Sequence, residues 1–137
     1  MKKLLTEWRK FLAEAKEIKV QEKSNGFTLD VYDEGKHIGQ YTHTREEDSD
    51  MVRNFAEVFP EHRGKGYGTI MLLAAIKAAR DLGIDFEEDG QSLTPAMSRR
   101  YDELYDSGFI YGGGGAWTIT PAGEDELEEW SSSGEHK

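Results

Sequence analysis

A short run of glycine and basic residues is the part of this sequence best suited to chemistry. Gly64, Gly66 and Gly68 stand at alternate positions with Arg63 and Lys65 between them, after an apolar strand pattern and before an apolar helix pattern. Glycines let a backbone approach a ligand closely, and the first N–H groups of a helix lack internal partners and carry partial positive charge. The run therefore predicts a cradle for a pyrophosphate. The alternative is a tight strand-to-helix turn that holds no ligand.

The spacing of this run differs from that of two common nucleotide motifs. A dinucleotide-binding turn would have a third glycine at position 69, which is threonine, and the Gly-Lys-Ser/Thr ending of a P-loop is absent. The pattern Arg63-x-x-Gly66-x-Gly68 instead resembles the acetyl-CoA signature of GNAT-type N-acetyltransferases.

The resemblance continues on both sides of the glycines, over residues 52–83 and the hairpin pattern at 27–44. In that family the fourth strand pairs with the pantetheine arm of acetyl-CoA, the next turn holds the pyrophosphate, and the fourth and fifth strands splay around the thioester. The resemblance thus implies acetyl-CoA as co-substrate and no metal. The cofactor-binding residues it implies are Val58, Phe59, Pro60, Arg63, Gly64, Lys65, Gly66, Tyr67, Gly68 and Thr69.

The tyrosine that this family often uses in catalysis has a shifted counterpart here. The family pattern is Tyr-x-x-x-Gly-Phe, but Tyr105 stands one residue closer to Gly108, and Leu104 occupies the expected place. One residue turns a helical side chain by about 100°. Tyr105 either reaches the thioester or packs in the core with Tyr101.

A general base is harder to find. Asn54 shares one face of the predicted strand with Val58. Its amide could order a water molecule but cannot abstract a proton, while Glu57 points to the opposite face. We therefore expect Asn54 and Tyr105 as catalytic candidates, with a water chain or a neutral amine serving where a base is lacking.

Composition and charge exclude several classes of protein. The chain has 137 residues, 36% of them hydrophobic, and a formal net charge of −10, which argues against disorder, a membrane span and broad nucleic-acid binding. Without cysteine and with four scattered histidines, a zinc cage is not expected.

The N-terminal residues do not continue as an export signal, so we expect a cytoplasmic protein. The acidic run 85–90 lacks the last ligand of a calcium loop, and we expect a solvated loop that could attract a cationic acceptor.

The element pattern predicts one mixed α/β domain over residues 1–137, with a splayed mixed sheet flanked by helices and a reduced N-terminal part. Expected in order are an amphipathic helix (1–17), a possible strand (18–20), a hairpin (27–42), a strand (51–59), a buried helix (68–82) and a short strand (84–86). A helix from 95 to a stop at 108, a glycine link (112–115), a strand (116–119), an acidic helix from 121 and a loose tail (131–137) follow.

Together these features predict an acetyl-CoA-dependent N-acetyltransferase in which a primary amine, such as a protein lysine or a polyamine, attacks the thioester directly. The alternative is a GNAT-like binding or assembly module without activity, of a kind that phages encode. In that case the helix at 1–17 could contact a protein partner or a second copy of the chain.

Overall fold

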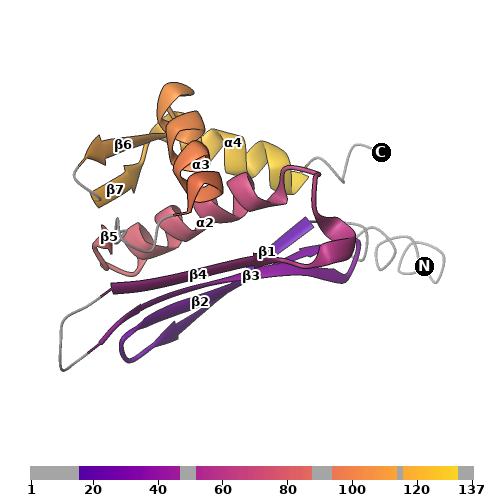
Figure 1. Cartoon of the computed structure of the whole chain (residues 1–137), viewed down its shortest axis with the longest axis horizontal. Coiled ribbons are helices and arrows are strands. Elements are labelled where there is room, and N and C mark those ends of the chain that lie inside the picture. Colours follow the sequence, from indigo (N-terminus) through magenta and orange to yellow (C-terminus); the bar gives the residue numbers. More distant parts are fainter. Residues whose placement is uncertain (1–15, 47–51, 88–93, 114–115, 133–137) are drawn as a thin grey trace, which may run out of the picture.

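The computed structural model describes residues 16–46, 52–87, 94–113 and 116–132. It confirms the predicted mixed α/β class: after an initial run of four strands, the chain continues as a helix, a strand, a helix, a two-stranded hairpin and a helix. Helices and strands carry the labels of Figure 1.

The first four strands form an antiparallel sheet in sequential order. They are β1 (Lys16–Lys23), β2 (Gly26–Asp33), β3 (Lys36–Arg45) and β4 (Val52–Val58). The turn between β2 and β3 has positive φ at both Glu34 and Gly35, 54° and 77°, which suits the right-handed twist of a tight hairpin. The expected helix 1–17 is wrong at its end, because Lys16 and Glu17 belong to β1. Residues 1–15 lie outside the described residues.

The helix α2 (Tyr67–Asp81) lies between this sheet and a second layer made of α3, α4 and the β6–β7 hairpin (Figure 1). A single 3₁₀ turn, Pro60–His62, joins it to β4. The helix α2 is apolar around most of its circumference, as the sequence indicated. This suits a helix that is covered by apolar surface on both sides. Its buried residues are Gly68, Met71, Leu72, Leu73, Ala74, Ala75, Ile76, Ala78 and Ala79.

The second sheet contains three short antiparallel strands in the order β5–β7–β6. They are β5 (Phe86–Glu87), β6 (Ile110–Gly113) and β7 (Ala116–Ile119). The helix α3 (Pro95–Asp106) connects β5 to β6, with the Thr94 side chain accepting a hydrogen bond from the Met97 N–H as expected of an N-cap. The helix α4 (Pro121–Ser132) ends the described chain.

The strands pair as two sheets, and no ladder joins β4 to β5 among the described residues, which agrees with the expected splay of the fourth and fifth strands. Two expectations about this half of the molecule need correction. The expected glycine link begins inside β6, where Gly112 and Gly113 pair with Trp117 and Ala116. The expected tail begins inside α4, which runs on to Ser132.

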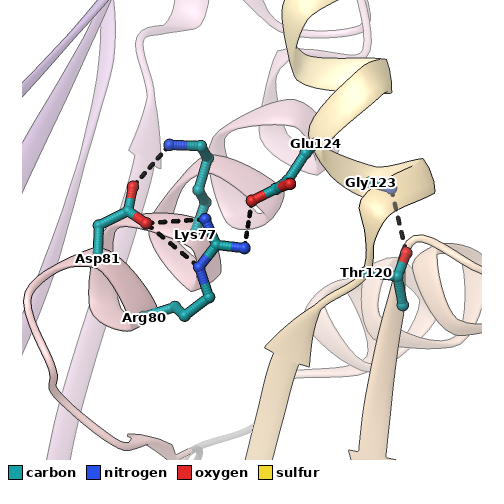
Figure 2. A network of polar contacts seen from close by, with 6 residues as sticks. All are labelled: Lys77, Arg80, Asp81, Thr120, Gly123 and Glu124. Carbon is teal, nitrogen blue, oxygen red and sulfur yellow. Dashed lines mark hydrogen bonds and ion pairs between the residues drawn. The ribbon is translucent and has the colours of Figure 1, made fainter.

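The C-terminal end of α2 carries a network of ion pairs, one of which reaches α4 (Figure 2). Arg80 pairs with Glu124 of α4 and, at 2.8 Å, with Asp81. Lys77 contacts Asp81 at 2.6 Å, and this hydrogen bond is the main reason that the pKa of Asp81 lies below its usual value. The cations in the last turns of α2 are thus paired with carboxylates, which matters for the comparison with its other end.

Candidate functional site

The turn into α2 has the backbone form that an open anion site requires. Gly64 and Gly66 have φ angles of +81° and +83°, in the left-handed region that glycine adopts without strain. A Cβ added to either would meet nothing within 4 Å, so the space beside both glycines is open. Gly66 is the N-cap of α2, where no side chain caps the helix and no acidic residue lies in the first turn. The first backbone N–H groups of α2 can therefore face a ligand.

The side chains of the turn supply positive charge, but one of them is engaged. Arg63 and Lys65 are both exposed. Arg63 Nε donates to the carbonyl oxygen of Val58 at 2.8 Å, on the strand end that the resemblance pairs with pantetheine. The N–H of Phe59 is also engaged, since it donates to the Ile38 carbonyl of β3 at 2.9 Å. A ligand pairing with Val58 through this carbonyl would share the oxygen with Arg63 or displace Arg63 from it.

Tyr67 contributes its backbone to the turn while its side chain packs internally. Its hydroxyl donates to Asp33 at 2.5 Å, and its ring lies edge-on to those of His62 and Trp130. Burial and, next, this hydrogen bond raise the pKa of Tyr67 to about 12. The predicted role of Tyr67 in binding a cofactor is thus left to its N–H group.

Asn54 joins β4 to β5 where the ladder between them is missing. Its Oδ1 accepts from the Tyr41 hydroxyl at 2.9 Å and lies 2.7 Å from His43 Nδ1, which must carry the proton in this contact because the amide oxygen only accepts. Its Nδ2 donates to the backbone oxygen of Glu87 in β5 at 2.9 Å. Asn54 does face the interior, as the strand alternation indicated.

His43 is a buried residue that the sequence reasoning missed. It is 1% exposed and stacked between the rings of Phe27 and Phe86. Burial lowers the pKa of His43 below 6.5, and Arg45 acts in the same direction, against opposing hydrogen bonds to Asn54 and to the Asp85 backbone. The ring is therefore neutral at physiological pH, with its one N–H on Nδ1, and only the protonated ring can donate to both Asn54 and the Asp85 backbone. Its place at an inward position of β3, two residues after Tyr41, was the signal available in the sequence.

Tyr105 lies at the surface of α3. It is 52% exposed and meets Trp117 edge-on at 6.0 Å, whereas Tyr101 is buried and stacked on the same Trp117. The interpretation that Tyr105 packs in the core is thus wrong. Leu104, at the position of the family tyrosine, is itself buried at 2% exposure. Among the described residues no hydrogen bond or ring contact joins Tyr105 to Asn54.

A second residue that the sequence did not reveal is Arg100 of α3. Its guanidinium lies against Gly68 in the first turn of α2. Nothing in the sequence near Arg100 relates it to the glycine run, because only the packing of α3 on α2 brings them together.

These features define a mixed α/β protein in which a glycine turn after an edge strand opens the start of a buried central helix. Its sequence matches the family described as Acetyltransferase (GNAT) family over residues 2–91, more than half of the chain, and it belongs to that family. The match includes β4, the glycine turn, α2 and β5, and it ends before α3 and Tyr105.

The other comparisons add no relative: neither the curated proteins nor the solved structures give a match. Within the described ranges, no helix is long and apolar enough to cross a membrane. The same residues contain no group of three or more histidine and acidic side chains that could hold a metal ion.

Proposed function

We propose that this protein is an acetyl-CoA-dependent N-acetyltransferase that acts on a primary amine. The observation that carries the proposal is the open turn at Gly64 and Gly66, leading into an uncapped helix, in a chain of the acetyltransferase family. The open space and the free N–H groups fit a diphosphate, which needs several donors converging on one point.

The residues of the turn would hold the cofactor. Backbone N–H groups from Gly64 to Thr69 receive the diphosphate, with Arg63, Lys65 and the Thr69 hydroxyl assisting. The end of β4, Val58–Pro60, takes the pantetheine arm, and the gap between β4 and β5 takes the thioester. Asn54 sets the width of this gap because it bridges both strands.

The reaction is a direct transfer. The amine nitrogen attacks the thioester carbonyl, a C–N bond forms, the C–S bond breaks, and the thiolate takes up a proton while the amine loses one. Tyr105 is proposed as the proton donor to the thiolate, since the residue is 52% exposed. Asn54 has one amide N–H left beyond its three contacts, and this group is proposed to orient a water molecule on the amine's proton path.

The acceptor is proposed to be cationic, either a lysine side chain of a protein or a polyamine. The formal charge of −10 favours such a substrate. The exposed Asp85 precedes β5, and Glu87 belongs to β5, where its carboxylate lies 3.0 Å from Arg45. We also propose that residues 1–137 form one cytoplasmic domain.

The experiment is a thiol-release assay with acetyl-CoA and either spermidine or a lysine-rich peptide, with acetylation of the amine confirmed by mass spectrometry. Tyr105→Phe should lower kcat about 100-fold and leave the KM for acetyl-CoA unchanged. Tyr111→Phe is the matched control, because Tyr111 is 60% exposed on β6 and should keep full activity. Equal activity of both variants would exclude Tyr105 as the donor.

The second candidate is a module that binds CoA without catalysis, or that acts through protein contacts. The hydrogen bond from Arg63 to Val58 favours it, because it occupies the strand end that a cofactor needs. The proposed contact through residues 1–17 falls outside the described residues, except for Lys16 and Glu17. Binding of acetyl-CoA without release of thiol to any amine would support this candidate.

A further inference from the structure

The guanidinium of Arg100 lies directly over the first turn of α2. A Cβ placed on Gly68 would be 2.5 Å from Cζ of Arg100 and 2.6 Å from its Nη2. The missing side chain at Gly68 thus makes room for a cation that comes from α3. The glycine turn has exposed cations on its own side, Arg63 and Lys65, so positive side chains approach the start of α2 from two elements.

Among the described residues, no carboxylate pairs with the positive groups that meet here. The N-terminus of α2 carries a partial positive charge, with no acidic residue in its first turn. Arg100 is half-buried, and among the described residues its one polar partner is Met97 Sδ, 3.2 Å from Nη1. A thioether is a weak acceptor, whereas guanidinium groups in such positions normally face carboxylate or phosphate oxygens.

The opposite end of α2 shows the usual arrangement for this protein. There Lys77 and Arg80 both pair with carboxylates, from Asp81 and Glu124. A chain with 27 acidic residues has many carboxylates to offer, yet none of the described ones contacts Arg100. An anion lying between Arg100 and the helix N-terminus would satisfy both.

We propose that Arg100 is a direct ligand of the cofactor's diphosphate, so that α3 closes the cradle opposite the glycine turn. This inference rests on the proposed function and adds to it a binding residue outside the part of the chain that matches the family. The planar fork of arginine can donate two parallel hydrogen bonds to phosphate oxygens, which lysine cannot.

The test is isothermal titration calorimetry of the full chain with CoA, inorganic pyrophosphate and pantetheine, which lacks phosphates. Arg100→Gln should weaken the binding of CoA and of pyrophosphate at least tenfold, as expected for a lost charge-assisted contact, and leave pantetheine binding unchanged. Arg99→Gln is the matched control: it makes the same change in net charge on the same helix, at an exposed position, and should alter CoA binding less than twofold. Arg100→Lys should give an intermediate loss.

The outcomes of these titrations distinguish a failure of this inference from a failure of the proposed function. Equal CoA binding by Arg100→Gln and Arg99→Gln would overturn the role of Arg100 while leaving the enzyme proposal intact. A loss of pantetheine binding as large as that of CoA would also overturn it, because Arg100 would then only shape the site. Tight, Arg100-dependent CoA binding without acetyl transfer would refute the proposed enzyme and keep the ligand role. A wild-type chain that binds no CoA would refute both.

Discussion

Asn54 and His43 form the polar centre of an otherwise apolar region between β3, β4 and β5. The amide oxygen and the amide nitrogen of Asn54 both make hydrogen bonds, and His43 has aromatic rings on both faces. Buried polar groups contribute most when every donor and acceptor is satisfied, and no buried side-chain nitrogen or oxygen lacks a partner within the described ranges. This small network therefore holds the two sheets in register where backbone pairing stops.

Replacing Asn54 with alanine should destabilise the fold by about 1 to 3 kcal/mol, because it leaves the ring N–H of the buried His43 without its acceptor and removes one contact of the Tyr41 hydroxyl. Urea denaturation followed by circular dichroism would measure this. Asn25→Ala, in the exposed turn between β1 and β2, provides the control and should cost under about 1 kcal/mol. Similar losses for both variants would mean that the network adds nothing.

His43 should make the stability of the protein fall in acid. The folded state keeps the ring neutral below its ordinary pKa of 6.5, while the unfolded chain takes up a proton there. Stability from this group is therefore fully present above pH 6.5 and is lost as the pH falls towards the lowered pKa. The urea midpoint should drop between about pH 7.5 and about pH 5.5, and less so in His43→Gln. An equal drop in both proteins would show that other groups are responsible.

At the scale of single residues, the sequence predicted which residues lie in the site but not which other residues they contact. Strand alternation placed Asn54 on the inward face, and the glycine pattern marked the turn at Gly64 and Gly66. The contacts of Asn54 with His43 and Glu87, and of Arg100 with Gly68, join residues from different elements. The Asn54–His43 contact depends on the register of β3 and β4, and the other two depend on how β5 and α3 pack, which no local pattern encodes.

The two ends of α2 differ in how they are held. The C-terminal end is tied to α4 by Arg80 and Glu124, whereas the N-terminal end opens on a glycine turn without a cap. A helix fixed at one end and lodged in the core can present its first N–H groups at a constant position. Such preorganised donors bind anions without having to be ordered first.

Gly66→Ala and Gly83→Ala form a matched pair that separates folding from binding. Both glycines have positive φ, +83° and +71°, and an added Cβ at either meets nothing within 4 Å. Each substitution should cost about 1 to 2 kcal/mol of stability. Thermal shift with acetyl-CoA should be reduced only in Gly66→Ala, because its methyl group would enter the cradle. A similar reduction in Gly83→Ala would show that the loss arises from destabilisation.

At the scale of elements, helices were easier to predict than short strands. The N-cap at Thr94 and the apolar run of α2 are local signals, and both are confirmed. The strand β6 was missed because Gly112 and Gly113 have low strand propensity, and its pairing with β7 supplies the hydrogen bonds that define it. Lys16 and Glu17 continue a helical apolar pattern but pair with β2.

In the molecule as a whole, α2 is the helix against which both sheets pack. Its apolar residues pack against β3 on one side and β7 on the other, and they belong to one cluster with Phe27, Tyr41 and Ile110. The local patterns of β4 and β5 do not reveal whether a ladder joins them, so only the resemblance to the family implied that these strands separate.

Leu73→Ala should therefore destabilise both sheets together. Leu73 is fully buried, and such a truncation typically costs about 2 to 5 kcal/mol. Circular dichroism and tryptophan fluorescence, which reports in part on Trp117 of β7, should give one coincident transition at a lower urea concentration. Two separate transitions would mean that the sheets unfold independently around α2.

The central claim is that the first N–H groups of α2 receive the diphosphate of acetyl-CoA. A nitrogen–proton correlation spectrum of the ¹⁵N-labelled chain, recorded during titration with acetyl-CoA, tests it most directly. The account predicts saturable shifts concentrated in the amides of residues 64–69, including those of Gly66 and Thr69. Unchanged amides at these positions with saturating acetyl-CoA, or shifts confined to another surface, would contradict it.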